Sequence, residues 1–575
     1  MDWRMTATCV VVAAAAVGAC HRSTAASSNA RVDALFAEWN KPDSSGCGVG
    51  VSQNGTVVYE HGYGMASLEL GVPISPASVF NVASISKQFT AMSIVLLAQQ
   101  GKLSLDDEVS KYVPGWADRE HRITIRHLLA HTAGLRDVFL LIELASPRVD
   151  GVNINDALMR ILARQRGLNF SPGSEFRYNN GGYNLLAGIV ARVSGQSFRD
   201  FTDANIFKPL GMTHTHFHDD PSLVVPNRAW GYHRDDTGVH LARAGGDSGG
   251  ILGNAGLFTT VGDLLLWEQN FADVRVGDRG LVAEMQTPVQ LTGGDKSPYG
   301  LGLEVSEDHG LKTIGHGGGD QGVGAYVIRY PDRGLAVAVL CNLDNIGFGV
   351  GELTRRVAAV YLPDVVPSAA ATRPPPKVSL SIEELRSKTG LYGDAALENF
   401  GRIFVRDGKL MVSLGAGAAG DGFELTPVDA THFVLLGTPV AVEFVPATAG
   451  RPQEIHVTGD GQKPSVSQLM SETFKPSRAE LSAFTGDYFS PELETTYTVG
   501  VRDAGLVIQI QGRADIDLTP IVPDAFTGSL VGMVKFSRDA RGHVIGFTVN
   551  ATDVRGLQFT RKQAVSVTGH GGASR

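Results

Sequence analysis

An internal repeat in the C-terminal part of the chain restricts its fold more than any other sequence feature. TGLY at Thr389 recurs as TGDY at Thr485, and VRDGKL at Val405 recurs as VRDAGL at Val501. Both pairs are 96 residues apart. Because a fixed period marks a repeated structural unit, the sequence predicts two similar domains in tandem. Short alternating stretches separated by turn glycines favour a small antiparallel β-barrel for each unit.

The remainder of the chain requires at least one more domain. A chain of 575 residues is too long for a single hydrophobic core. A segment rich in proline and small residues predicts a linker over 363–379, between a large domain over 31–362 and repeat units over 380–475 and 476–565. The net charge is -9, without runs of like charge, which argues against nucleic acid as a partner.

The N-terminal residues 1–20 have the pattern of a secretion signal, in which an arginine precedes an apolar stretch from Cys9 to Val17. This stretch is too short to span a membrane. The sequence VGAC ending at Cys20 resembles the cleavage box of bacterial lipoproteins, where the cysteine is lipidated; ordinary signal-peptidase cleavage is the alternative. With a polar tether over 21–30, we expect an exported, periplasmic protein that meets the membrane only through a lipid anchor.

The sequence FNVASISKQFTAM places a serine and a lysine at the start of a helix. Residues 88–100 are mostly apolar and precede Gly101, which predicts a buried helix with a glycine C-cap. Ser84 lies at the N-terminal end, where exposed N–H groups favour a developing negative charge. Lys87 lies on the same helical face and can help to deprotonate the serine. Since S-x-x-K is common by chance, a serine N-cap beside a solvated lysine is the alternative.

Two further motifs follow at a distance. RYNNGGYNLLAGIV places Tyr178 and Asn180 in the turn before a helix with one apolar face. GHGGGD places His316 before consecutive glycines that end at Gly319, where a strand backbone can lie against a ligand. Three separated motifs are much harder to obtain by chance than one.

Together these motifs resemble the serine penicillin-recognising family, which includes class C β-lactamases, low-molecular-weight penicillin-binding proteins, D-aminopeptidases and related esterases. The resemblance covers 31–362 and includes the flanking sequences ITIRHLLAHTAGL and YGLGLEV. It implies an α/β (α+β) catalytic domain with an antiparallel sheet and a helical cluster. The pairs that match the three family motifs are Ser84 with Lys87, Tyr178 with Asn180, and His316 with Gly318.

The resemblance implies a catalytic role for the first two motifs. Ser84 would attack a carbonyl carbon and form an acyl-enzyme that water later hydrolyses. Either Lys87 or Tyr178 would accept the serine proton, and nearby positive charge would lower the pKa of the tyrosine.

The resemblance also implies substrate-binding roles. The N–H groups of Ser84 and Gly319 would form an oxyanion hole. Asn180 would orient the substrate amide, and Gly318 would belong to the strand that lines the cleft. His316 would take the place that lysine holds in other members and supply a charge or a hydrogen bond.

The substrate is where the sequence departs from most of the family. Other members carry serine or threonine in the middle of the third motif, whose hydroxyl helps to bind a substrate carboxylate, whereas this chain has Gly317. Loss of such a bond costs about 1.5–3 kcal/mol, and the missing side chain leaves room for the amino end of a substrate. This favours a D-aminopeptidase acting on small molecules or peptides. A carboxylesterase, a β-lactamase or a DD-peptidase is the alternative, and a non-catalytic protein that binds peptidoglycan fragments or β-lactams is another.

Tandem β-barrels behind such a domain resemble D-aminopeptidases of this family. They would serve for packing, for substrate gating or for cell-wall binding, of which we favour the first two. No cofactor is implied. His127 and His131 lack the glutamate of H-E-x-x-H, and the alternating histidines at 214, 216 and 218 lie in family scaffold, so no metal is expected.

Two cysteines remain if the signal peptide is removed and Cys20 is lipidated. In the family's sheet, the first strand pairs with the strand GLAVAVLCN, which would bring Cys47 near Cys341. An oxidising compartment then allows a disulfide between them, and two unpaired buried cysteines are the alternative.

Overall fold

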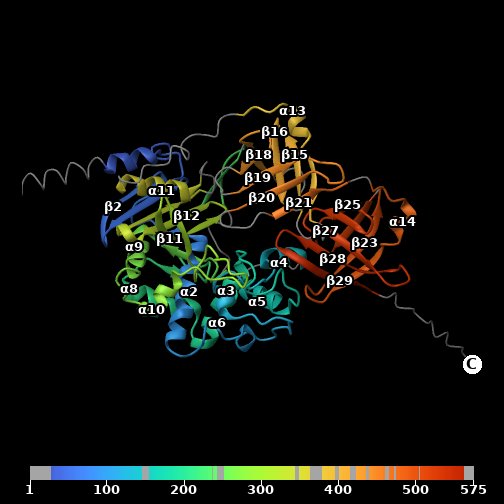
Figure 1. The fold of residues 1–575 in the computed structure, drawn as a ribbon. Coiled ribbons are helices and arrows are strands. Elements are labelled where there is room, and N and C mark those ends of the chain that lie inside the picture. The colour runs from blue at the N-terminus through green and yellow to red at the C-terminus, as the bar shows by residue number, and fades with distance from the viewer. Residues whose placement is uncertain are drawn as a thin grey trace, which may run out of the picture.

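The computed structural model describes residues 28–145, 154–235, 237–242, 251–343, 349–362, 378–394, 400–414, 422–435, 440–459, 465–471, 474–503 and 505–562. The predicted signal peptide, Cys20 and most of the predicted linker lie outside these residues. Within them, a large α/β domain precedes two closed antiparallel barrels of eight strands each (Figure 1). The predicted fold class is therefore confirmed.

The large domain is built on a six-stranded antiparallel sheet with the strand order β10-β11-β12-β13-β1-β2 among the described residues. Asn54 and Gly55 form the tight turn between β1 and β2 with positive φ angles of 50° and 75°, which suits this residue pair. The strands are β1 (Cys47–Gln53), β2 (Thr56–Tyr63), β10 (Glu304–Asp308), β11 (Leu311–Asp320), β12 (Val323–Tyr330) and β13 (Leu335–Cys341).

Helices cover both faces of this sheet. The helical residues 28–35 and α11 (Val350–Tyr361) pack on one face, where Phe36, Val49 and Val357 share a buried cluster. The other face packs against α9 (Val261–Asn270). Because β-branched and aliphatic residues on β1 and β13 are buried on both faces, this sheet is the centre of the domain.

A cluster of helices surrounds α2 (Ser86–Gln99), which is buried along nearly its whole length. The apolar sequence predicted this burial, and Gly101 follows the helix with a positive φ of 67°. The other helices are α3 (Ile125–Leu129), α4 (Val138–Ala145), α5 (Ile154–Arg164), α6 (Asn180–Ser194), α7 (Phe198–Thr202), α8 (Lys208–Leu210) and α10 (Arg279–Met285), with short helices η1 (Ala83–Ile85), η2 (Val109–Lys111), η3 (Asp203–Phe207) and η4 (Pro331–Arg333). Short strands are β3 (Met65–Ser67), β4 (Val72–Pro73), β5 (Phe80–Asn81), β6 (His216–Phe217), β7 (Tyr232–Asp235), β8 (Gly238–Leu241) and β9 (Leu257–Thr259).

The two barrels repeat the same local structure. Each follows a short helix with a capping box at its N-terminus. Ser381 caps α13 (Ile382–Arg386), and Ser477 caps α14 (Arg478–Ser482). The first barrel comprises β14 (Gly390–Gly393), β15 (Phe400–Arg406), β16 (Lys409–Leu414), β17 (Phe423–Pro427), β18 (His432–Leu435), β19 (Ala441–Val445), β20 (Glu454–Thr458) and β21 (Ser465–Leu469). The second comprises β22 (Gly486–Ser490), β23 (Thr495–Arg502), β24 (Gly505–Ile510), β25 (Ile516–Val522), β26 (Ala525–Gly528), β27 (Gly532–Arg538), β28 (Val544–Ala551) and β29 (Val554–Arg561).

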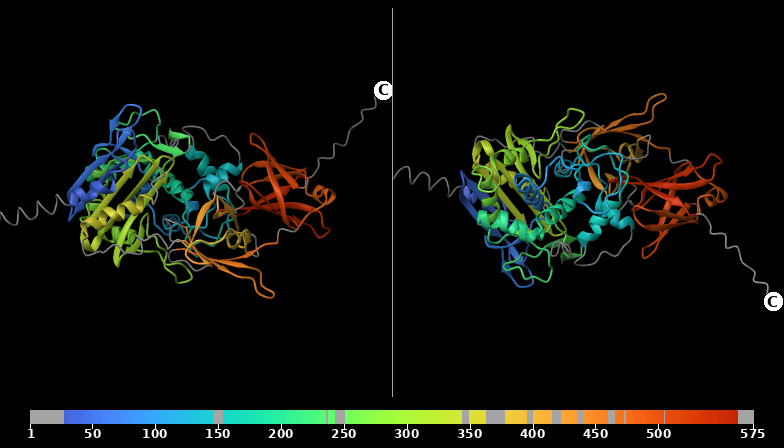
Figure 2. Two further views of the ribbon diagram at one scale, coloured as in Figure 1. Left: turned by 90° about the horizontal axis from the view of Figure 1, so that it is seen from above. Right: turned by 90° about the horizontal axis from the view of Figure 1, so that it is seen from below.

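The second barrel packs against the large domain. Figure 2 shows it beside the helices α4 and α5, and its interior belongs to the same buried apolar cluster as those helices. The buried Tyr497 hydroxyl donates a 2.6 Å hydrogen bond to the Leu144 carbonyl oxygen. The first barrel contacts the second through Leu391, which packs with Ile521 and Met533. None of the helices in the described part of the chain is long and apolar enough to cross a membrane.

The structure contains a disulfide between Cys47 and Cys341, which lie opposite each other on β1 and β13. The two cysteines are 294 residues apart in sequence, so the bond restricts a large loop of the unfolded chain.

We predict that removal of this disulfide lowers the stability of the protein. In a chain that begins at residue 28, the double variant Cys47→Ala/Cys341→Ala should lose about 2–4 kcal/mol of unfolding free energy. Thermal unfolding followed by circular dichroism should show a lower Tm for the variant. Reductant should lower the Tm of the parent chain and leave the variant unchanged. Two reactive thiols in denatured, unreduced parent protein would contradict the bond.

Candidate active site

Ser84 lies in a strained turn between β5 and α2. Ala83 has a positive φ of 43°, a left-handed conformation that is rare outside glycine. Hydrogen bonds hold it there: its N–H donates to Asn81 Oδ1 at 2.9 Å, and its carbonyl accepts from Ser86 Oγ at 2.6 Å. The strain is therefore supported by buried neighbours, which is common where a turn presents a reactive group.

Lys87 is completely buried and its amine has three partners. Nζ lies 3.0 Å from Ser84 Oγ, 2.9 Å from Asn180 Oδ1 and 2.9 Å from the Asn254 carbonyl oxygen. Burial lowers the pKa of Lys87 well below its ordinary value, with a smaller opposing effect from the Glu304 carboxylate. A neutral amine donates its two protons to the two carbonyl-type oxygens. Its lone pair then faces the Ser84 hydroxyl, as a general base requires.

Tyr178 completes the group around the serine. Its ring centroid lies 4.7 Å from Lys87 Nζ, and its hydroxyl is close enough to Ser84 for that side chain to act on its pKa. Burial raises the pKa of Tyr178 above its ordinary value, and the influence of Ser84 only partly offsets this effect. The expected lowering of this pKa is therefore wrong. Tyr178 is 38% exposed. The cation that was expected to stabilise its phenolate form is Lys87, and burial disfavours the charged form of Lys87 itself.

Asn180 is the first residue of α6, and Asn179 caps that helix by accepting a hydrogen bond from the Gly182 N–H at 3.0 Å. The cap places Tyr178 and Asn180 on either side of one anchored residue. Because the side-chain oxygen Oδ1 of Asn180 accepts from Lys87, the side-chain nitrogen Nδ2 of Asn180 is the group left to contact a substrate. Its role in substrate binding stays a prediction.

His316 lies on β11 beside this group and is also buried. Its Nδ1 donates to the Gly317 carbonyl oxygen at 2.5 Å, so its Nε2 accepts from the Tyr299 hydroxyl at 2.7 Å. Burial lowers the pKa of His316 below its ordinary value. Of the two roles that the resemblance offered, the structure favours a hydrogen bond over a charge.

The glycines of β11 have different surroundings. A Cβ on Gly318 would lie 2.2 Å from the Val82 carbonyl oxygen and 3.3 Å from the Ser84 nitrogen, so only glycine lets the strand approach the serine turn this closely. A Cβ on Gly319 would meet nothing within 4 Å. A Cβ on Gly317 would lie 3.1 Å from the Tyr326 ring, which fills the space beside this glycine. The expectation that Gly317 leaves room for the amino end of a substrate is therefore wrong.

Sequence reasoning did not assign functional contacts to several residues at this site. His131, a residue with a positive φ of 58°, accepts from the Asn179 N–H at 3.0 Å, and its ring lies 4.3 Å from that of Tyr178. Asn254 contributes a backbone carbonyl, for which a side-chain motif gives no signal. Glu304 hydrogen bonds to Tyr326 and influences the pKa of Lys87.

The alternating histidines at 214, 216 and 218 do not converge on one point. His216 Nε2 lies 3.3 Å from His218 Nδ1, whereas His214 is exposed and close to Asp263. Among the described residues, no group of three or more histidine, cysteine, aspartate or glutamate side chains is arranged to hold a metal ion.

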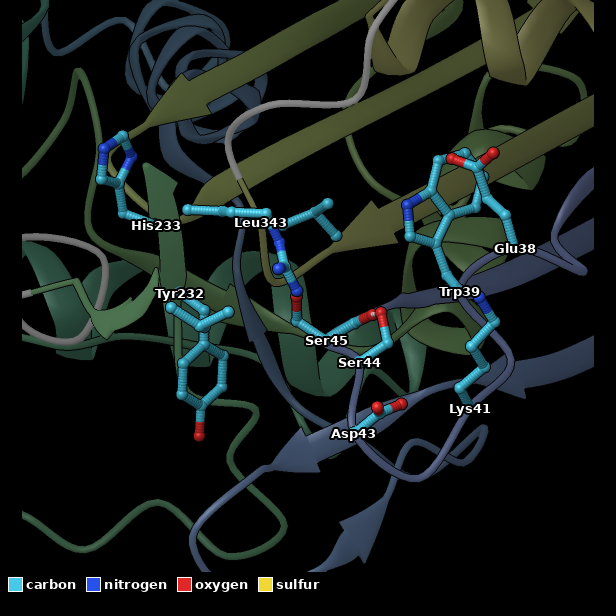
Figure 3. Close-up of a pocket in the computed structure, with 11 residues that line it drawn as sticks. Glu38, Trp39, Lys41, Asp43, Ser44, Ser45, Tyr232, His233 and Leu343 are labelled. Carbon is cyan, nitrogen blue, oxygen red and sulfur yellow. Dashed lines mark hydrogen bonds between the residues drawn. The ribbon is translucent and has the colours of Figure 1, made fainter. Parts of the chain in front are cut away.

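A separate cavity of about 530 Å³ lies near the start of β1 (Figure 3). Trp39, Tyr232 and Leu343 form part of its wall, together with the charged side chains of Lys41 and Arg234. None of the residues that line it is a candidate catalytic residue. The chemistry is therefore assigned to the group of side chains around Ser84 and not to this cavity.

The Beta-lactamase family model matches residues 32–362, more than half of the chain. The chain belongs to this family, which confirms the resemblance found in the sequence. The D-aminopeptidase of Brucella ovis is 28% identical over 329 residues, which are 57% of this chain and 62% of the relative. The match thus spans less than two thirds of that relative.

Two other proteins match more of the chain. The D-aminopeptidase of Brucella anthropi is 25% identical over 533 residues, which are 90% of this chain and 95% of the relative. The octameric penicillin-binding protein homologue of Pyrococcus abyssi has a similar structure, with a TM-score of 0.52 at 21% identity, over 85% of this chain and 98% of that chain. The expectation of a serine hydrolase is supported at the level of the family.

We predict that Lys87 is more important to the reaction as a base than as a charge. Lys87→Arg keeps a cation but cannot lose its proton, so kcat/KM should fall by about 10²–10⁴-fold. Tyr178→Phe should cause a smaller loss, and Ser84→Ala should remove nearly all activity. In the unaltered protein, kcat/KM should rise with pH as Lys87 loses its proton, and this rise should occur well below pH 10.5. Activity of Lys87→Arg equal to that of the unaltered protein would refute the assignment.

Proposed function

We propose that this protein is a serine hydrolase that cleaves an amide bond through an acyl-enzyme on Ser84, with the specificity of a D-aminopeptidase. The observation that carries the proposal is the 3.0 Å contact between Ser84 Oγ and the buried Lys87 amine. A serine becomes a nucleophile when an adjacent base accepts its proton, and burial favours the neutral, basic form of this amine. A protein that only binds ligands has no need of such a pair.

The proposed reaction gives each of these groups one role. Ser84 Oγ attacks the carbonyl carbon while its proton moves to Lys87 Nζ, and the backbone N–H groups of Ser84 and Gly319 stabilise the oxyanion. As the carbon–nitrogen bond breaks, Tyr178 donates its proton to the leaving nitrogen and regains one from Lys87. Water then attacks the ester carbon and gives a proton to Lys87. Lys87 passes this proton to Ser84 Oγ as the ester carbon–oxygen bond breaks, which releases the acid and restores the free serine.

The choice of an aminopeptidase rests on two observations. The D-aminopeptidase of Brucella anthropi matches along 90% of this chain, a length that includes both barrels. In addition, the Tyr326 ring, whose hydroxyl donates to Glu304 at 2.9 Å, lies 3.1 Å from the position of a Cβ on Gly317, so it restricts the space for a hydroxyl side chain that would bind a substrate carboxylate. Although the Arg355 guanidinium lies 5.7 Å from the same ring, the carboxylate of Glu304 disfavours a second negative charge there.

We predict a defined order of substrates. Turnover of D-alanyl-p-nitroanilide should exceed that of p-nitrophenyl butyrate, and nitrocefin should be slowest because it carries a carboxylate. L-alanyl-p-nitroanilide serves as the control for the D configuration. All four should be measured on one preparation, with Ser84→Ala as the blank. If nitrocefin were by far the best substrate, the argument from Gly317 would be wrong.

The nucleophile can be tested without knowledge of the substrate. A fluorophosphonate should increase the intact mass of the protein by one phosphonyl group, and Ser84→Ala should remain unmodified. A mass that never changes would leave the non-catalytic alternative as the better explanation.

We also propose that the mature protein is a lipoprotein attached to a bacterial membrane through Cys20. Cells that express the full chain with labelled palmitate should produce a labelled protein in the membrane fraction. Cys20→Ser should abolish the label and release the protein into the periplasm, because a single cysteine carries the anchor. A mature N-terminus at another residue would contradict this proposal.

A further inference from the structure

The second barrel contacts the large domain directly behind the turn that carries Tyr178 and Asn180. The contacts include residues 491–494, between β22 and β23, and residues 552–556, at the turn between β28 and β29. In Figures 1 and 2 this barrel lies beside α4 and α5, the helices next to that turn. The barrel is thus close to the active site without lining it.

Arg136 is the centre of the interface. Its side chain is 2% exposed, and its Nη1 lies 2.7 Å from Oε2 of Glu492, whose side chain is 9% exposed. Its Nε donates to the Arg555 carbonyl oxygen at 2.8 Å, and its Nη2 donates to the Gly556 carbonyl oxygen at 3.0 Å. A shift of the barrel too small to admit water would leave a buried guanidinium and a buried carboxylate without their partners, which is strongly unfavourable. The barrel is therefore held rigidly at this point.

The backbone around Arg136 in turn holds the catalytic turn. Asn179 Nδ2 donates to the carbonyl oxygens of Leu135 at 2.9 Å and Arg136 at 3.3 Å, while its Oδ1 caps the first turn of α6. Because Asn179 stands between Tyr178 and Asn180 in the sequence, its position sets the positions of both. Hydrogen bonds thus connect Glu492 to the Arg136 side chain and the Arg136 carbonyl to Asn179, the residue that follows the catalytic tyrosine.

A second set of contacts reaches the same turn from its other side. Arg177 precedes the catalytic tyrosine, and its Nη1 lies 2.9 Å from Asp553 Oδ1. The Asp553 carbonyl oxygen accepts from the Asp137 N–H at 2.9 Å and from Asn169 Nδ2 at 2.9 Å. The 552–556 loop therefore fixes the segments on both sides of the catalytic turn.

We infer that the second barrel is a positioning element of the active site, in which Glu492 and Asp553 hold the turn of Tyr178 through Arg136 and Arg177. Both carboxylates bond to arginines and not to the reacting groups, so they are positioning residues. A displacement of about 1 Å in such a turn can cost on the order of 10²-fold in rate. The inference rests on the proposed hydrolase only for its rate measurement, because the order of the turn can be measured independently.

Two variants and one matched control test the inference in the full chain. Glu492→Gln keeps the shape of the side chain but removes the charge that pairs with Arg136. Asp553→Ala removes the partner of Arg177 at a site where the aspartate side chain is 44% exposed, so this variant should fold. Asp524→Asn is the control, because Asp524 pairs with Arg538 at 2.7 Å within the same barrel.

Three measurements are made on each protein: the Tm, hydrogen exchange of peptides that cover 174–186, and the rate at which a fluorophosphonate modifies Ser84. Well below the Tm, exchange of this segment should be about tenfold faster in both variants, and labelling should slow by about 10- to 100-fold in Glu492→Gln. Asp553→Ala should show a smaller loss of rate. Asp524→Asn should match the unaltered protein in exchange and rate.

The outcomes separate this inference from the proposed function. A lower Tm with unchanged exchange and labelling would show that the barrel only stabilises the fold, and would overturn the inference. If Glu492→Gln does not fold, Asp553→Ala alone decides by the same criteria. Hydrogen exchange could be faster in the variants while the fluorophosphonate labels not even the unaltered protein. That result would refute the proposed hydrolase function and support the positioning role of the second barrel.

Discussion

The buried amine of Lys87 is the group on which the arrangement of the site depends. It bonds to Ser84 before α2, to Asn180 at the start of α6 and to the carbonyl of Asn254 between β8 and β9. Removal from water disfavours the charged form of a lysine. A neutral lysine amine can donate two hydrogen bonds, here to two oxygen acceptors, and its lone pair can accept one from a hydroxyl. The serine therefore gains its base only when three segments, distant in sequence, have come together. Three local features hold these segments in place: the strained turn at Ala83, the helix cap at Asn179 and the close approach of β11 at Gly318.

Features that rest on local pattern could be predicted from the sequence. The 96-residue repeat predicted two β-barrels, because a repeated spacing of turns and strands means a repeated unit. The structure even repeats single hydrogen bonds, from Tyr392 to the Lys388 carbonyl and from Tyr488 to the Phe484 carbonyl. Likewise, the spacing of Ser84 and Lys87 placed both on one helical face, where the structure has them in contact.

Features that depend on burial and on tertiary contacts could not be predicted. The pKa of Tyr178 was expected to fall because a lysine is near, but the desolvation that surrounds the site acts on both groups and raises the tyrosine pKa. Glu492 and Asp553 belong to no motif, and in a sequence they resemble any other acidic residue of a surface loop. Only the docking of the barrel shows that one of them is buried against Arg136.

The edge of the sheet beside the catalytic serine has a consequence for ligands. β10 pairs with β11 only as far as Gly315, so the backbone from His316 to Asp320 has no neighbour on that side among the described strands. A ligand that lies along this edge can pair its main chain with the strand. Once its backbone is held in this way, the two configurations at its α-carbon direct their side chains to opposite sides of the cleft.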